Sequence, residues 1–357
     1  HRGLEVTSAS TESDRLRLTT IRRSEQENQH GILELIPVTA EIVRVRYTES
    51  HFDEAPSPAL LAQPDFSDWK VSSFKDSIRL ETDVLTVHIT RSTAAIQFCD
   101  KTDQVIVAEP KEGGKILQRI EVKEIQSENM EVEEIASVDG IKHRLTSNSE
   151  ATSSRQAYAS TLCWNLQEDE AIYGLGQHEK GCFDYRDREE FLYQANMKVA
   201  IPTFVSNRGY AIHQDQHCFA HFSALDGQLR WWSEAVPQLD YFFIYGPDFD
   251  EIIDGLRQLT GDLPMLPRWA YGYIQSKERY ESASELIAVA RRYRDEKIPI
   301  DALVLDWSSW EDGLWGEKHL DPARFPDPSA MMQHLHQMNI KLMVSIWPNM
   351  RQGGQNH

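Results

Sequence analysis

The stretch Leu305–Trp315, LDWSSWEDGLW, places three tryptophans and three carboxylates directly after an apolar run. Asp306 ends that run, and Trp307 follows it. A carboxylate accepts hydrogen bonds from two neighbouring hydroxyls, and an aromatic face covers the apolar C–H side of a sugar ring. The combination therefore indicates carbohydrate binding. An open alternative is structural: Asp306 caps a neighbouring backbone amide, and the tryptophans pack at the rim of the fold.

Two further groups of residues belong to the same part of the chain. Trp347 and Met350 close a later apolar run, SIWPNM, and there they either form another wall of the same pocket or pack beneath a loop. Glu311 and Asp312 are adjacent carboxylates, but such a pair in a loop beside Gly313 usually faces solvent. We therefore expect no direct catalytic role for this pair.

Neither of two candidate motifs indicates a metal or nucleotide site. In HQDQH, the side chains of His213, Asp215 and His217 would lie on one side of an extended segment. No cysteine, further acidic residue or second histidine cluster completes a ligand set, so we expect a surface strand or turn. GLGQHEKG near Tyr173 lacks the third glycine and the strand–helix setting of a nucleotide-binding loop.

The elements that carry these residues change character along the chain. Residues 1–246 consist of short alternating or β-branched segments separated by Gly, Asn, Asp and Ser turns, which predicts an antiparallel β-sandwich. Within them, residues 109–153 are rich in Glu, Lys and Ser and are expected to form solvated strands and loops. Residues 247–265 are predicted to be a helical connector, with Gly261 as its C-cap.

Residues 266–357 alternate between strands and helices. WAYGYIQS, IDALVLDW and KLMVSIWP are apolar strand candidates. Between them lie a helix opened by a Ser282/Glu285 capping box and a helix with Pro328 in its first turn. The second helix is expected to bury one face, formed by Met332, Leu335 and Met338. This order predicts a parallel sheet with helical crossovers, either open or closed into a barrel.

Ligands bind at the carboxyl ends of parallel strands in both topologies. Those ends are residues 274–276, 306–310 and 347–350, so Ile274 joins Asp306, Trp307, Trp347 and Met350 on the predicted functional rim.

Length, charge and cysteine use limit the class of protein. The 357 residues suffice for two or three domains, and a net charge of −19 argues against nucleic acid or an anionic membrane as a partner. No apolar run approaches the ~20 residues of a membrane helix. The cysteines are widely spaced, which predicts free thiols and modestly favours a reducing compartment such as the cytoplasm. They are Cys99, Cys163, Cys182 and Cys218. Localisation stays open because the chain begins without Met.

Five segments together resemble glycoside hydrolase family 31, the α-glucosidase and α-xylosidase family. They are IYGLGQHEKG, IPTFVSNRGYAI, LPRWAYGYIQSKERY, PIDALVLDW and FPDPSAMMQHLHQMNIKLMVSIWP, in this order. The resemblance implies an N-terminal β-sandwich followed by the first three strands and two helices of a (β/α)8 barrel.

The resemblance also implies roles for particular residues. Asp306 matches an aspartate that binds hydroxyls of the sugar in subsite −1, and Trp307 matches the position beside it. Met350 matches a wall position after the third strand, and Asn196 matches a residue on a loop of the N-terminal domain that reaches the barrel mouth.

Family members are similar in placing a nucleophilic aspartate after strand four and an acid/base aspartate after strand six. Both positions would lie beyond His357, so the sequence is expected to be an inactive fragment of a longer chain. The resemblance implies a retaining, exo-acting α-glycosidase for α-glucosides or α-xylosides that needs no cofactor. Three alternatives remain: α-galactoside or α-N-acetylgalactosaminide cleavage, a non-catalytic carbohydrate-binding or scaffold protein, and homo-oligomer assembly through sandwich edges.

Overall fold

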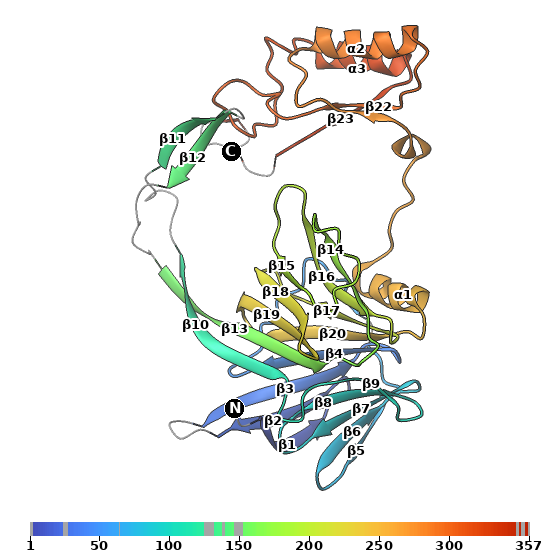
Figure 1. Cartoon of the computed structure of the whole chain (residues 1–357). Coiled ribbons are helices and arrows are strands. Elements are labelled where there is room, and N and C mark those ends of the chain that lie inside the picture. Colours follow the sequence, from blue (N-terminus) through green and yellow to red (C-terminus); the bar gives the residue numbers. More distant parts are fainter. Residues whose placement is uncertain are drawn as a thin grey trace. The chain divides into compact units, whose positions relative to one another are not determined.

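A computed structural model describes residues 3–23, 28–63, 65–124, 132–137, 140–145, 153–347, 350, 354 and 355. The chain divides into two compact units, His1–Asp262 and Leu263–His357. The first is almost entirely β-sheet, and the second alternates between strands and helices (Figure 1). Both parts of the predicted fold, the antiparallel sandwich and the beginning of a barrel, are confirmed.

In its described residues, the first unit contains three antiparallel sheets and one separate hairpin. The largest sheet runs in the order β1 (Glu5–Thr11), β2 (Leu16–Arg22), β3 (Gln29–Pro37), β4 (Ile42–Thr48), β20 (Leu239–Tyr245), β17 (Tyr210–Gln214), β16 (Val199–Ser206) and β14 (Ile172–Gln177). The second sheet runs β10 (Lys115–Glu124), β13 (Ser153–Asn165), β19 (Gln228–Val236), β18 (Ala220–Leu225) and β15 (Glu189–Leu192). The third runs β5 (Lys70–Ser73), β6 (Ser77–Glu81), β7 (Leu85–Thr90), β8 (Ile96–Asp100) and β9 (Val105–Ala108). The hairpin pairs β11 (Val132–Ser137) with β12 (Gly140–Leu145).

Strand β20 is buried on both faces, because its alternate side chains enter two different cores. On one face Phe243 stacks on Phe98 of β8, with ring centroids 3.9 Å apart, and Tyr241 meets Trp164 of β13 edge to face. Aromatic pairs of this kind contribute about 0.5–1.5 kcal/mol beyond their buried area. All three sheets therefore share one core.

The other face of β20 packs against helix α1 (Phe249–Thr260). Ile252 and Leu259 of the helix are buried there, whereas Ile253 is 46% exposed. Gly261 ends the helix at the predicted C-cap position, and its positive φ of +93 is one that glycine adopts readily. The segment predicted as a connector thus forms a helix that is part of the first unit's core.

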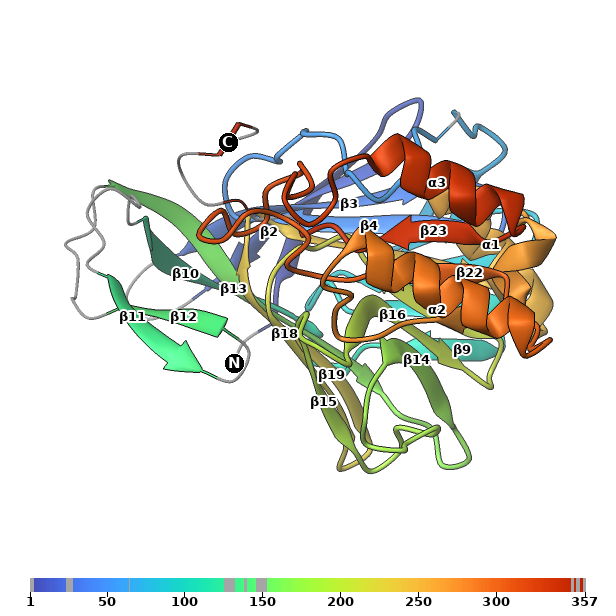
Figure 2. The same cartoon turned by 90° about the horizontal axis from the view of Figure 1, so that it is seen from above.

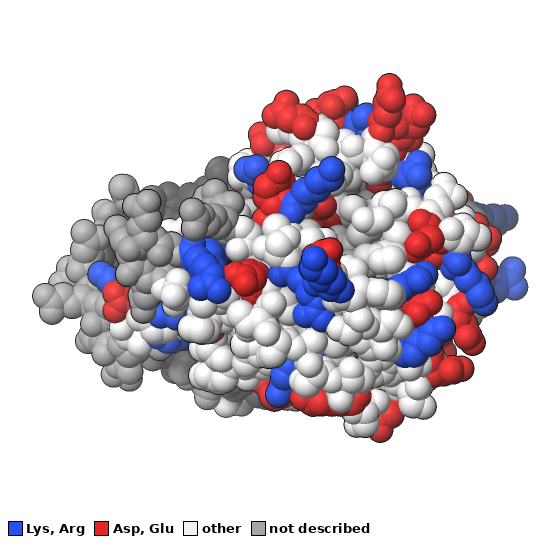
Figure 3. All heavy atoms as spheres, turned by 90° about the horizontal axis from the view of Figure 1, so that it is seen from below, with Lys and Arg blue, Asp and Glu red and all other residues white. Residues whose placement is uncertain are grey.

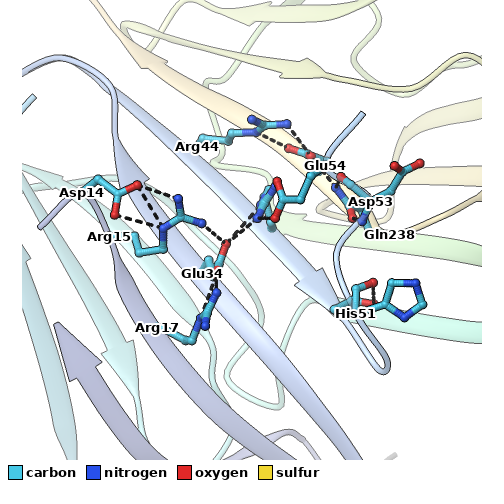
Figure 4. Close-up of polar contacts among 12 residues, drawn as sticks. Asp14, Arg15, Arg17, Glu34, Arg44, His51, Asp53, Glu54 and Gln238 are labelled. Atoms are coloured by element: carbon cyan, nitrogen blue, oxygen red, sulfur yellow. Dashed lines mark hydrogen bonds and ion pairs between the residues drawn. The ribbon is translucent and has the colours of Figure 1, made fainter. Parts of the chain in front are cut away.

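A row of alternating charges crosses four strands of the largest sheet. Arg17, Glu34, Arg46 and Asp240 are successive cross-strand partners. Glu34 is fully buried and accepts hydrogen bonds from Arg17 at 2.6 Å and Arg15 at 3.1 Å (Figure 4). It also accepts a hydrogen bond from Arg46 at 2.7 Å. Opposite charges placed directly across a sheet stabilise the pairing and fix its register.

The charged segment 109–153 is less exposed at its beginning than predicted. Glu109 and Lys115 are both buried, with Lys115 Nζ 2.6 Å from Glu109 Oε1. Lys115 also donates to the carbonyl of Ala94, and Glu109 accepts from the backbone N–H groups of Ile96 and Gly114. The expectation of solvation is wrong here because a complete set of partners allows two charges to be buried. Much of the rest of the segment lies outside the described side chains.

The expectation of a surface strand or turn for HQDQH is wrong for its first two residues. His213 and Gln214 end the buried strand β17, and His213 Nδ1 lies 2.8 Å from Thr203 Oγ1. The Asp215 carboxylate accepts a hydrogen bond from Ser57 Oγ and makes none with His213. The side chain of His217 is exposed. The three side chains therefore do not form a shared site. Burial lowers the pKa of His213 to about 4.

The second unit contains a parallel sheet of β21 (Ile274–Gln275), β22 (Ala302–Leu305) and β23 (Lys341–Val344), covered by α2 (Ala283–Asp295) and α3 (Pro328–Gln337). A short 3-10 turn, Arg268–Tyr271, precedes β21. The two helices lie side by side on the same side of the sheet (Figures 1 and 2). Ser282 caps the N-terminus of α2, and its hydroxyl accepts a hydrogen bond from the Glu285 N–H as predicted.

The buried face of α3 differs from the prediction by one residue. Met331 and Leu335 are buried, Met338 packs at the edge of the same core, and Met332 is only half-buried. Spacings of four and then three residues place Met331, Leu335 and Met338 on one stripe of the helix. The prediction chose the wrong residue because Met331 and Met332 are adjacent, and the apolar pattern is compatible with either of them on the buried face.

Surface and cysteine features agree with a folded, acidic protein. On the face shown in Figure 3, Lys and Arg side chains stand among Asp and Glu side chains. All four cysteines are free, and Cys99 is fully buried.

No helix in the described ranges combines the length and apolar composition needed to cross a membrane.

Replacing Lys115 by Met should destabilise the first unit by about 3–5 kcal/mol, because it leaves the Glu109 carboxylate buried without its partner. Urea unfolding of the whole protein followed by far-ultraviolet circular dichroism measures the change. Arg23→Met, which breaks the exposed Arg23–Glu5 pair, is the matched control and should alter stability far less. Equal effects of the two substitutions would contradict the role given to burial.

His213 should make stability pH-dependent. Its folded pKa of about 4 lies below the value of about 6.5 expected when unfolded, so the unfolded state gains a proton first as pH falls. Stability should therefore decrease from pH 6.5 to pH 4, by on the order of 3 kcal/mol relative to His213→Asn. Urea unfolding of both proteins across this range tests it, and parallel pH profiles would show that His213 does not titrate in this way.

Candidate functional site

The parallel register brings three strand ends to one edge of the second unit. Ala302 of β22 pairs with Ile274 of β21 on one side and with Lys341 of β23 on the other. Leu305 and Val344 are then partners at the carboxyl end, and the N–H of Ser345 donates to the carbonyl of Leu305. Residues that follow Leu305 and Ser345 must therefore meet at this rim.

Asp306 is the first residue beyond β22 and is half-buried. Its Oδ1 accepts a hydrogen bond from the backbone N–H of Trp307 at 2.8 Å. Among the described residues, no hydrogen bond reaches its second oxygen, Oδ2. The carboxylate thus caps the neighbouring amide with one oxygen and keeps the other as an acceptor, so the structural role and the capacity to bind a hydroxyl coexist.

Four tryptophans from two strand ends form one aromatic cluster beside Asp306: Trp307, Trp310, Trp315 and Trp347. Trp315 and Trp347 meet nearly at right angles, with ring centroids 5.0 Å apart. Trp307 lies 5.8 Å from Trp315 and 6.4 Å from Trp347. Trp310 is buried and completes the group, while the other three are half-buried.

Arg279 joins the cluster from the segment between β21 and α2. Its guanidinium lies 5.8 Å from the centre of the Trp307 ring and donates to Ser308 Oγ at 3.1 Å. Ser308 has φ +57, a left-handed conformation that turns the chain sharply after Trp307. The arginine therefore holds the turn through Ser308 and places a positive charge beside the Trp307 ring.

Polar contacts to the backbone fix the long loop between β22 and α3. Arg324 donates to the carbonyl of Trp310 and pairs with Asp321 at 2.7 Å, and the Asp321 N–H donates to the carbonyl of Ser309. The hydrogen bond from Arg324 lowers the pKa of Asp321. Farther along the loop, Lys318 bridges the carbonyls of Gly316 and Trp347. These hydrogen bonds from side chains to backbone carbonyls hold the tryptophan cluster in place.

The structure brings some of the predicted site residues together and leaves others as predictions. Trp307 and Trp347 contact each other beside Asp306 as the strand-end argument required. Ile274 is half-buried in β21. Met350 is half-buried, and the residues on both sides of it are outside the described ranges.

Asn196 is exposed on a tight turn of the first unit, where the Lys198 N–H donates to the carbonyl of Ala195 and Met197 has φ +64. Its part in a site with the second unit stays a prediction. Glu311 and Asp312 are exposed, as expected.

Sequence reasoning did not select Trp310, Trp315 and Arg279 as site residues. The two tryptophans stand in LDWSSWEDGLW, so the pattern contained them, but nothing in their spacing showed that a turn at Ser308 would fold them back. Arg279 precedes Trp307 by a whole helix and had no local indication. At this rim, no set of three His, Cys, Asp or Glu side chains from the described residues is close enough to share a metal ion.

Comparison with protein families gives two matches. The model of the glycosyl hydrolases family 31 TIM-barrel domain matches residues 263–357. The model of the glycosyl hydrolase 31 N-terminal galactose mutarotase-like domain matches residues 32–222.

Among curated relatives, an alpha-xylosidase of Saccharolobus solfataricus is 42% identical over 194 residues, covering 52% of this chain and 26% of the relative. Alpha-glucosidase 2 of Bacillus thermoamyloliquefaciens is 23% identical over 342 residues, covering 90% of this chain and 38% of the relative. The chain therefore spans well under half the length of these relatives.

Among solved structures, an alpha-xylosidase from Xanthomonas citri superposes with a TM-score of 0.78 at 21% identity, over 97% of this chain and 50% of that one. An alpha-xylosidase from a soil metagenome, complexed with xylose, gives a TM-score of 0.74 at 25% identity, over 96% of this chain and 47% of that one. At 21% identity, the similarity to the Xanthomonas citri structure shows the fold alone.

Proposed function

This chain belongs to glycosyl hydrolase family 31, and from that membership we propose that the protein is a retaining, exo-acting α-glycosidase that removes terminal α-xylosyl or α-glucosyl residues. The observation that carries the proposal is the pairing of Asp306, with one carboxylate oxygen free among the described residues, with the tryptophan cluster. A hydroxyl acceptor beside ring faces fits a pyranose, whose rim is polar and whose faces carry C–H groups.

Asp306 would bind and orient the sugar, and proton transfer would belong to other residues. Retaining enzymes use two carboxyl groups about 5–5.5 Å apart, one as the nucleophile that forms a covalent glycosyl-enzyme and one as acid and then base. Among the described residues of this rim, the other acidic side chains of LDWSSWEDGLW are Glu311 and Asp312, and both are exposed. The chain covers only 26% and 38% of the length of two relatives, which supports our proposal that the catalytic pair belongs to a part of the protein outside these 357 residues.

An α-xyloside is our first choice of substrate. The S. solfataricus relative with 42% identity is an alpha-xylosidase, and two of the superposed structures carry the same name. A xylosyl residue differs from a glucosyl residue by the missing exocyclic CH2OH group, so the choice depends on whether the pocket leaves room for that group. A non-catalytic binding protein of the same fold would bind the sugar without releasing it.

In the whole protein, Asp306→Asn should lower kcat/KM on p-nitrophenyl α-xyloside by about 100-fold or more. The amide keeps the shape of the side chain but replaces one acceptor oxygen with a donor, which misplaces the bound ring. Steady-state hydrolysis measures the loss, with p-nitrophenyl α-glucoside and α-galactoside as parallel substrates. The 357-residue chain alone should release no p-nitrophenol.

Glu311→Gln and Asp312→Asn are the matched controls, because each removes a nearby carboxylate that is exposed. Both should keep near-normal turnover. Normal turnover of the Asp306 variant would remove the proposed role of that residue, and the absence of hydrolysis of all three substrates by the whole protein would favour the binding protein.

A further inference from the structure

A group of three potential metal ligands lies in the first unit, on the five-stranded sheet β5–β9. In this sheet Val87, Ile89 and Phe98 point into the core. Side chains alternate between the two faces of a strand, so His88 of β7 and Cys99 of β8 point to the opposite face. His88 is paired with Gln97, two residues before Cys99, which makes His88 and Cys99 diagonal neighbours.

The third member comes from the turn that joins β8 to β9. Asp103 returns over the outer face, where its Oδ1 lies 2.7 Å from His88 Nε2. A ring nitrogen of His88, the Sγ of Cys99 and a carboxylate oxygen of Asp103 all lie within 4.8 Å of one another. Cys99 is buried, His88 is half-buried and Asp103 is exposed, so the group reaches solvent through Asp103.

The turn is held firmly in this position. Asp100 Oδ1 accepts hydrogen bonds from the N–H and hydroxyl of Thr102 and from the N–H of Gln104. The Asp103 N–H donates to the carbonyl of Asp100, and Asp103 has φ +68, a left-handed conformation that aspartate tolerates better than most residues. Asp103 is therefore placed by the backbone, independently of its contact with His88.

The chemistry of the three groups suits a borderline-soft divalent ion. Zinc accepts imidazole nitrogen, thiolate sulfur and carboxylate oxygen, commonly in tetrahedral sites where water is the fourth ligand. Bond lengths of about 2.0–2.3 Å require ligand atoms about 3.3–3.8 Å apart. Small side-chain rotations would bring the three atoms to that spacing, with the His88–Asp103 hydrogen bond exchanged for two metal bonds.

Neighbouring side chains provide outer contacts of the kind that orient ligands. The Gln97 amide lies 3.4 Å from the Cys99 sulfur as a donor. Arg79 lies 3.7 Å from the Asp103 carboxylate, and its charge is offset by Glu81 at the same distance. A thiolate and a carboxylate would neutralise the two charges of the ion.

We propose that His88, Cys99 and Asp103 form a binding site for a divalent transition-metal ion, with Zn²⁺ the best suited. On binding, the Cys99 thiol releases its proton to solvent and ligates as thiolate, and neutral His88 ligates through Nε2. The bound ion cross-links β7, β8 and the β8–β9 turn. The site stands within the first unit and is independent of the proposed glycosidase activity.

Cobalt is the probe that tests the site, since a thiolate bound to Co²⁺ gives a charge-transfer absorption that histidine and carboxylate ligands do not give. The whole, metal-free protein is titrated with Co²⁺ under reducing conditions, and Zn²⁺ is then added. We expect one thiolate–cobalt band that Zn²⁺ abolishes by displacement, and a rise in Tm with Zn²⁺.

Cys99→Ser should abolish the band, and His88→Gln and Asp103→Asn should each weaken Co²⁺ binding at least tenfold. Cys163→Ser, at another free cysteine, is the matched control and should leave the band unchanged. His88 and Asp103 lie toward solvent, so their variants should fold even if Cys99→Ser does not, and circular dichroism checks this. The proposal is overturned if the wild-type protein shows no band, if the band survives Cys99→Ser, or if folded His88 and Asp103 variants bind Co²⁺ like the wild type.

Discussion

The parallel pairing of β22 with strands on both sides is the constraint on which the candidate site depends. Ala302 is in register with both Ile274 and Lys341, and this fixes where each strand ends relative to its neighbours. Slipping the register by one residue would turn Leu303 and Leu305 out of the core and move Asp306 away from the rim. The core between the sheet and the two helices therefore determines the position of the carboxylate.

The first unit depends on a different device, a strand buried on both faces. β20 contributes aromatic side chains to the shared core of three sheets and apolar side chains to the contact with α1. Its one acidic residue, Asp240, is buried, and burial raises its pKa while hydrogen bonds from Arg44 oppose that shift. Charges are thus buried in this unit where each has a specific partner, as at Glu34 and at Glu109.

Local patterns predicted the elements well because the forces that form them act over a few residues. The Ser282 cap, the Gly261 C-cap and the alternation of strands and helices are all properties of short segments. Burial was predicted less well where partners are distant in sequence. Lys115 donates hydrogen bonds to the carbonyl of Ala94 and to Glu109, and the strand of His213 is paired on both sides. The burial of these two side chains could therefore not be recognised from their own segments.

In the candidate site too, the features that follow from local patterns were predicted and those that depend on distant partners were not. The strand-end rule placed Asp306, Trp307 and Trp347 together, because parallel strands must end at the same edge. The turn at Ser308 and the approach of Arg279 are tertiary features with no periodic pattern, and they bring Trp310 and Trp315 into the cluster.

The most direct test of the central claim is a crystal structure of the whole protein with an α-xyloside bound. We predict that Asp306 Oδ2 accepts hydrogen bonds from sugar hydroxyls, while Oδ1 keeps the Trp307 N–H and the tryptophan cluster borders the ring. A sugar bound away from Asp306, or an Asp306 carboxylate fully occupied by protein donors, would contradict the account.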